Sequence, residues 1–178
     1  MLKEAATMSK QDIIEELALY LRPPGQGIYA VSTGKAELAA FSRQYLGKEC
    51  DWKEHITYWA EHSTSENKVL LAIPCDTGAG IVRGAARGPE GIRRQLKHAP
   101  VFDLGDILTV PHFLDDSLLN EEQKNRTRQS IYSHFKGASK NSLPVSALSM
   151  AERSVKLLQA LNPRVKIHLL GGDHSTTW

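Results

Sequence analysis

The sequence predicts an α/β fold in which helices cover a mostly parallel sheet. Three short apolar segments, 69–73, 101–106 and 165–170, have the length and composition of buried strands. The stretches between them are long enough for crossover connections and carry helical patterns of their own. An alternation of strand, helix and strand is typical of a parallel sheet with helices packed on its faces.

Three helices are expected ahead of the strand at 69–73. The first begins at Ser9 as its cap, carries Asp12 in its first turn, and ends at 23–25, a Pro-Pro-Gly segment that cannot continue a helix. A weaker helical stretch covers 35–45. The N-terminal third of the chain is therefore expected to be mainly helical.

The third of these helices, at 51–62, concentrates aromatic and histidine side chains on one face. That face holds His55, Tyr58, Trp59 and His62. Two histidines on one helix face can in principle bind a metal ion, but the surrounding aromatic rings favour a packing face. We therefore expect aromatic packing here and no metal site.

Further helices are expected between the strands. Pro89 suits the first position of a helix, where its missing N–H is no loss, and Glu90 suits the positive end of the helix dipole. A charged segment, 120–136, is expected to be helical. Pro144 is expected to open another helix that stops at 162–163, an Asn-Pro pair.

Composition places the chain among ordinary globular domains. Its 178 residues are 41% hydrophobic and 24% charged, which argues against disorder and coiled coil. The net charge is only +2 and its signs are interspersed, so no nucleic-acid or membrane partner is expected. Cys50 and Cys75 form no C-x-x-C pair, and the N-terminus lacks the apolar region of a secretory signal. We therefore expect two reduced thiols and a cytoplasmic location.

The segment 169–175, Leu-Leu-Gly-Gly-Asp-His-Ser, holds the candidate functional residues. In open parallel sheets, ligands bind in the crevice beyond the carboxyl ends of the strands, and Asp173 and His174 follow such an end. The two glycines permit a tight turn, and Ser175 can cap a short helix. These residues alone do not decide whether His174 has a structural role or binds a ligand.

Four motifs in order resemble those of the ureohydrolases, the arginase and agmatinase family. The motifs are Ile-Pro-Cys-Asp-Thr-Gly at 73–78, Arg-Gly-Ala-Ala-Arg-Gly-Pro-Glu-Gly-Ile-Arg at 83–93, Asp-Leu-Gly-Asp at 103–106 and Gly-Gly-Asp-His-Ser at 171–175. The resemblance divides the chain into an N-terminal helical extension, 1–67, and the N-terminal part of a ureohydrolase α/β/α domain, 68–178.

The resemblance implies a three-layer, arginase-like α/β/α fold with a binuclear manganese site at the carboxyl edge of the sheet. Family members hydrolyse a C–N bond of a guanidino or amidine group and release urea, using a metal-bridging hydroxide. The family's first histidine ligand falls on His174, and Asp173 is a neighbour that faces the site without binding metal. The resemblance also implies a small guanidino substrate, agmatine in preference to arginine, and a homo-oligomer, a trimer or hexamer.

Other polar residues of these motifs are given supporting roles. Arg93 is expected to organise the fold, and Asp76 to shape a loop. The segment 111–116 places a histidine and two carboxylates close together, and it is expected to be a solvated loop, with contact to the substrate as the less favoured alternative.

The chain departs from the family pattern at the remaining metal ligands. Its aspartates form neither Asp-x-His-x-Asp nor Asp-x-Asp, and one imidazole cannot hold two manganese ions against water. We therefore expect the N-terminal portion of a longer ureohydrolase, inactive by itself. Two alternatives stay open: a non-catalytic ureohydrolase-like chain with an interaction or structural role, and an unrelated nucleotide-binding domain. The segment 78–91 lacks the glycine and lysine patterns of the latter.

Overall fold

The structure is a computed structural model of the chain. It describes residues 8–29, 34–47, 51–64, 67–96, 99–135 and 138–177. Cys50 and Trp178 lie outside these ranges. Within them, no helix combines the length and the apolar composition needed to cross a membrane.

The centre of the fold is a four-stranded open sheet in the order β1-β3-β2-β4. The strands are β1 (Leu21–Arg22), β2 (Lys68–Ile73), β3 (Phe102–Ile107) and β4 (Lys166–Gly171). β2 pairs in parallel with both β3 and β4, whereas β1 pairs antiparallel with β3. The predicted α/β class, with a mostly parallel sheet, is therefore confirmed, as are the three predicted strands.

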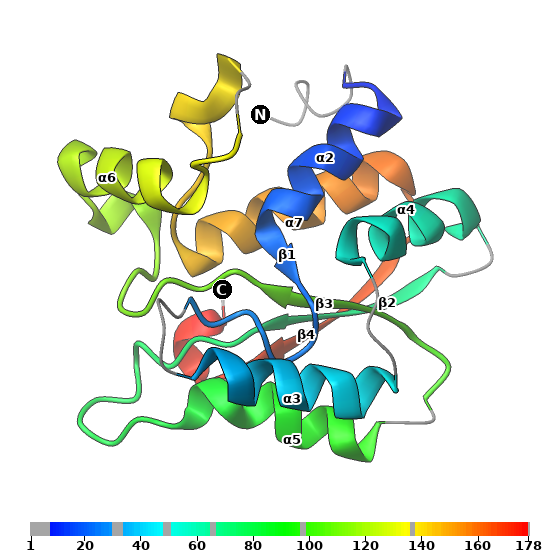
Figure 1. The fold of residues 1–178 in the computed structure, drawn as a ribbon, viewed down its shortest axis with the longest axis horizontal. Coiled ribbons are helices and arrows are strands. Elements are labelled where there is room, and N and C mark those ends of the chain that lie inside the picture. The colour runs from blue at the N-terminus through cyan, green and yellow to red at the C-terminus, as the bar shows by residue number, and fades with distance from the viewer. Residues whose placement is uncertain are drawn as a thin grey trace.

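Helices lie on both faces of this sheet (Figure 1). One face carries α2 (Lys10–Tyr20), α4 (Trp52–His62) and α7 (Ala147–Leu161), and the other carries α3 (Lys35–Leu46) and α5 (Gly88–Gln95). α6 (Glu121–Ile131) projects beside the first group. The result is a helix, sheet, helix arrangement in which β2, with 69–73 at most 2% exposed, lies at the centre.

Local sequence explains where most helices begin. The Ser9 hydroxyl accepts from the Asp12 N–H at 3.1 Å, and the Asp12 carboxylate accepts in return from Ser9, so the predicted cap of α2 is confirmed. Asp51 caps α4 by accepting from the backbone N–H groups of Lys53 and Glu54. Pro89 lies in the first turn of α5, as expected.

The start of α7 differs from the prediction. The helix begins at Ala147 and not at Pro144, because the Asp116 carboxylate holds the preceding backbone in an extended form. Asp116 Oδ1 accepts from the Ser146 N–H at 2.9 Å and from the Val145 N–H at 3.1 Å. α6 also ends earlier than expected, at Ile131.

The N-terminal segment packs into the same core as the rest of the chain. Leu17, Tyr20 and Leu21 are at most 2% exposed and belong to the main hydrophobic cluster. β1, which the sequence did not predict, adds to the sheet beside β3. The described parts of 1–67 and 68–178 therefore share one core. The boundary between 67 and 68 stays a prediction from the ureohydrolase resemblance, which covers only the second segment.

Candidate functional site

The carboxyl ends of β2 and β4 lie at the same edge of the sheet. Their register runs from Lys68 opposite Lys166 to Ile73 opposite Gly171, so both strands end at the same level. A Cβ at Gly172 would lie 2.0 Å from the Cys75 carbonyl oxygen, and this close approach requires glycine. The turn after β4 is thus held directly against the loop after β2.

Asp173 caps the short 3-10 helix η4 (His174–Thr176) that follows this turn. Its Oδ1 accepts from the Ser175 N–H at 2.9 Å and from the Ser175 hydroxyl. Its Oδ2 is buried and has no hydrogen-bond partner among the described residues. A buried carboxylate oxygen without a donor is costly, which makes this atom unusual within the fold.

His174 lies exposed at the rim of a hollow of about 520 Å³. The hollow is lined by Ile73, Leu169, Gly171, Gly172, Asp173, His174, Thr176 and Thr177. It therefore combines an apolar floor from β2 and β4 with a polar wall from the turn after β4. The predicted position of His174, just past the carboxyl end of a parallel strand, agrees with this geometry.

The described residues do not fit a binuclear manganese pair. Among them, no group of three or more His, Cys, Asp or Glu side chains is arranged to hold a metal ion. His174 offers one imidazole, and one oxygen of the neighbouring Asp173 is already occupied by Ser175. Two manganese ions need several oxygen ligands, so we derive no catalytic step through a metal here.

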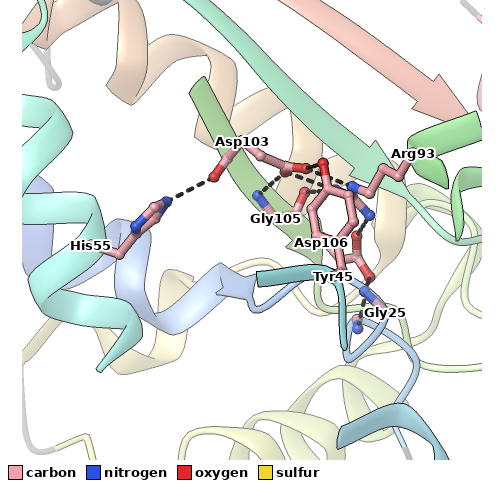
Figure 2. Close-up of polar contacts among 8 residues, drawn as sticks. Gly25, Tyr45, His55, Arg93, Asp103, Gly105 and Asp106 are labelled. Carbon is pink, nitrogen blue, oxygen red and sulfur yellow. Dashed lines mark hydrogen bonds and ion pairs between the residues drawn. The ribbon is translucent and has the colours of Figure 1, made fainter. Parts of the chain in front are cut away.

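A second polar cluster surrounds Arg93, whose side chain is fully buried (Figure 2). The guanidinium donates from Nε and Nη2 to the two carboxylate oxygens of Asp103, at 2.8 and 3.0 Å. Nη1 donates to Asp106, and Nη2 also reaches the Gly105 carbonyl at 2.8 Å. Burial lowers the pKa of Arg93, but attraction to Asp106 and Asp103 outweighs it, so the net pKa is raised.

The same cluster joins the N-terminal segment to β3. Asp106 accepts from the Gly25 N–H at 2.7 Å and from the Gly27 N–H at 3.2 Å. The Tyr45 hydroxyl of α3 donates to the Asp103 carboxylate at 3.0 Å, and His55 of α4 contacts the Asp103 carbonyl at 2.9 Å (Figure 2). This arrangement agrees with the expectation that Arg93 organises the fold.

The aromatic face of α4 packs as expected. The His55 ring stacks between Trp52, at 4.4 Å between centroids, and Phe102 of β3, at 4.5 Å. Tyr58 stacks on His62 at 4.2 Å. His55 therefore packs between α4 and the sheet, whereas His62 is exposed and stacks on the half-exposed Tyr58.

Asp76 shapes the loop after β2, in agreement with its expected role. Its carboxylate accepts from the Gly84 N–H at 2.8 Å and from Arg83 at 3.3 Å. Hydrogen bonding from the Gly84 backbone and the nearby Arg83 guanidinium lower the pKa of Asp76. The ionised carboxylate closes the neck of a loop that runs from 77 to 82.

The polar residues of 111–116 separate in space. His112, with a left-handed φ of 71°, lines a cavity of about 190 Å³ that Cys75, Asp76 and Arg83 also line. Asp115 instead caps a short 3-10 helix by accepting from the Ser117 N–H, and Asp116 holds the start of α7. The histidine of this segment therefore borders a cavity at the carboxyl edge, whereas its two carboxylates hold local structure.

Sequence reasoning did not identify the network around Asp103 or the unpaired oxygen of Asp173. The Asp-Leu-Gly-Asp motif at 103–106 indicated where the first of these features lies, but it did not indicate which residues bind to its two carboxylates. Nothing in the sequence indicates the second, because it depends on how the loop after β2 meets the turn after β4.

The molecule is thus an α/β protein with an open, mostly parallel sheet and a candidate site at its carboxyl edge. No family model, no curated protein and no solved structure matches this chain. The resemblance to the ureohydrolases accordingly stays a prediction from the four motifs.

Proposed function

We propose that the chain forms one side of the active site of a manganese-dependent, agmatinase-like ureohydrolase. Such an enzyme hydrolyses a guanidino or amidine C–N bond and releases urea. The observation that carries the proposal is the position of His174, beyond the carboxyl end of β4 and on the rim of the 520 Å³ hollow. Ligand sites of open parallel sheets occur at this edge.

The finer fold assignment, an arginase-like α/β/α domain, belongs to the same proposal. It is supported by the parallel pairing of β2 with β3 and β4, and by helices on both faces of the sheet (Figure 1). A homo-oligomer, a trimer or hexamer, is likewise proposed from the resemblance alone. A cytoplasmic location is proposed from the two unpaired cysteines and the lack of a secretory signal pattern at the N-terminus.

In this proposal, His174 is one manganese ligand and the other ligands come from polypeptide outside the described residues. At the hollow, the described residues supply one imidazole, that of His174, which is insufficient for a metal pair. The described residues are therefore not proposed as a competent catalyst by themselves. Their contribution is the shape of the hollow and one ligand at its rim.

The test is a urea-release assay on protein expressed from the complete reading frame, with Mn²⁺ and with agmatine, arginine or 4-guanidinobutyrate. We expect urea from at least agmatine. His174→Ala should lower the rate by more than about 100-fold. Mutating a residue that only hydrogen-bonds to a metal ligand already lowers metal affinity or activity by roughly 10–100-fold. The matched control is His168→Ala, at an exposed histidine of β4 outside the hollow, which should leave the rate unchanged.

Two results would contradict the proposal. One is the absence of urea release from the unaltered protein with all three substrates. The other is a His174→Ala variant that binds Mn²⁺ and releases urea as well as the unaltered protein does.

A non-catalytic, ureohydrolase-like chain with an interaction or structural role is the second candidate. It is favoured by β4, whose outer edge pairs with no strand among the described residues and whose Leu169 is 41% exposed. Sedimentation of the purified chain tests it. A monomer that unfolds cooperatively would argue against this candidate, and an obligate assembly would favour it.

A further inference from the structure

The outer edge of β4 presents a row of outward-facing backbone groups. β4 pairs with β2 from Lys166 to Gly171, and with no other strand of the described residues. The Lys166 N–H donates to the Asn67 carbonyl at 2.7 Å, so the backbone groups of Lys166 face β2. Successive residues of a strand direct their N–H and C=O groups to opposite sides. Those of Ile167, Leu169 and Gly171 therefore face away from β2 and can pair with a further strand.

The two outer strands of the sheet differ in how their edges are protected. β1 has two residues, and Pro23 and Pro24, which follow it, have no N–H to donate. β4 has six residues, pairs with β2 without a bulge, and contains no proline and no Lys, Arg, Asp or Glu after Lys166. Short length, charges, bulges and proline are the features that keep natural edge strands from pairing with another chain. The edge of β4 has only Lys166 as such a feature, so it is suited to pairing.

Leu169 adds an apolar surface to this edge. Its side chain is 41% exposed, and it lies beside Leu71 of β2 on the same face of the sheet. Leu71 is fully buried in the main core, where α7 packs on β2 and β3. The apolar core therefore continues sideways from Leu71 to Leu169, where it is only partly covered.

We propose that the outer edge of β4 is an interface between two copies of this chain, whose β4 strands pair antiparallel across a two-fold axis at Leu169. A two-fold axis perpendicular to the sheet reverses the strand direction and keeps each face of the sheet on the same side. Leu169 then pairs with Leu169 of the second copy, and Ile167 pairs with Gly171 of the second copy. All these residues direct their backbone groups outward, so each pair exchanges hydrogen bonds. The two four-stranded sheets join into one continuous sheet.

The side chains of β4 favour a second copy in this register. The exposed surface of Leu169 is covered by the identical surface of the second copy. On the opposite face of the sheet, His168 lies opposite Leu170, and Lys166 lies opposite Gly172, beyond the paired residues. No two cationic groups are therefore opposed. An axis at His168 is less favourable, because it places two imidazoles directly opposite each other in a closely spaced pair.

The interface adjoins the hollow, because Leu169 and Gly171 belong to both. A second copy therefore adds a wall to the hollow on the side of β4. The inference goes beyond the proposed function and does not depend on it, since strand pairing needs neither a metal ion nor a substrate.

Sedimentation velocity and amide hydrogen exchange of the purified chain test the inference. We expect monomer to convert to dimer as the concentration is raised over a roughly 100-fold range. In the dimer, exchange should slow at the N–H groups of Ile167, Leu169 and Gly171. Exchange at His168 and Leu170 should be slow in monomer and dimer alike, because these N–H groups face β2. This alternation distinguishes edge pairing from association through another surface.

Substitutions at Leu169 test the position of the axis. Leu169→Lys and Leu169→Glu each place two like charges opposite each other, and each should weaken dimerisation by at least about tenfold. An equimolar mixture of the two variants should restore the dimer, because opposite charges then face each other across the axis. The control is Leu118→Lys, at a residue that is 71% exposed and lies outside β4, which should leave dimerisation unchanged. Circular dichroism checks that each variant is folded.

The inference is overturned if the chain stays a monomer over this range, if it assembles without slower exchange at Leu169, or if Leu169→Lys assembles as readily as the unaltered chain. Slow exchange at Ile167 and Leu169 in a monomer also overturns it, because another segment of the chain then covers the edge. Failure of the mixed variants to associate overturns the axis at Leu169. None of these measurements depends on urea release, so this inference and the proposed function can fail separately.

Discussion

The Arg93 cluster contains carboxylates from within β3, and the turn after β4 contains the carboxylate of Asp173, but the two regions differ in how these carboxylates are paired. Around Arg93, each oxygen of Asp103 and Asp106 accepts at least one hydrogen bond. At the turn, one oxygen of Asp173 is paired and the other has no partner among the described residues. A fully paired buried network holds elements together, whereas the unpaired oxygen of Asp173 makes no such connection among the described residues.

The largest expected effect is that of removing the cation from the paired cluster. Arg93→Met should lower the free energy of unfolding by about 3–5 kcal/mol, because it leaves Asp103 and Asp106 buried without a counter-charge. Urea denaturation measures this loss. The matched control is Arg94→Met, at the neighbouring exposed residue that lies over the Phe41 ring, which should cost less than about 1 kcal/mol. Equal losses in the two variants would contradict the structural role of Arg93.

The same substitution at the two regions gives the sharpest comparison. Asp106→Asn should destabilise the protein by about 3 kcal/mol, because one carboxylate of a buried ion-pair network is lost. Asp173→Asn should change the free energy of unfolding by less than about 1 kcal/mol, since its unpaired oxygen contributes no hydrogen bond. Thermal unfolding of both variants checks this. A large loss at Asp173 would show that its second oxygen has a structural partner.

A smaller effect is expected from the contact that holds the turn against the loop after β2. Gly172→Ala should cost about 1–3 kcal/mol, because the added methyl group meets the Cys75 carbonyl oxygen. The control is Gly91→Ala in α5, where a Cβ meets nothing within 4 Å. That change should stabilise the helix by up to about 1 kcal/mol. Chemical denaturation of both variants distinguishes a tight contact from a general intolerance of alanine.

The smallest expected effect is the pH dependence of the loop 77–82, whose two ends are joined by Asp76. The pKa of Asp76 is lowered in the folded protein, so its contribution is present above about pH 4, the ordinary aspartate pKa, and is lost as pH falls through the lower folded value. The contribution should be less than about 1 kcal/mol, because the Arg83 partner is partly exposed. Hydrogen exchange at 77–84 should therefore accelerate, beyond the intrinsic change of exchange rate, only in strong acid. Asp76→Asn should abolish this dependence, and an extra acceleration of exchange near neutral pH would contradict it.

Much of the fold could be predicted from local sequence, because short apolar runs, the Ser9 cap and Pro89 act over a few residues. Features that depend on distant partners could not. β1 has only two residues, and it forms because they pair with the edge of β3. α7 begins at Ala147 because Asp116, 30 residues before Ser146, binds the Ser146 backbone. At the candidate site, the place of His174 followed from strand order. The unpaired oxygen of Asp173 could not be predicted, because it depends on the three-dimensional contact between two loops.

The pairing of Gly25 with Asp106 has a consequence for how the protein is made. These residues are 81 positions apart, so α2, α3 and α4 leave the ribosome well before the strand that they cover has been synthesised. Their apolar faces, including Leu17 and Trp59, have no sheet to pack against until β3 emerges. The nascent chain therefore passes through a stage with exposed hydrophobic helices, which is the kind of segment that chaperones bind and that aggregates when translation stalls.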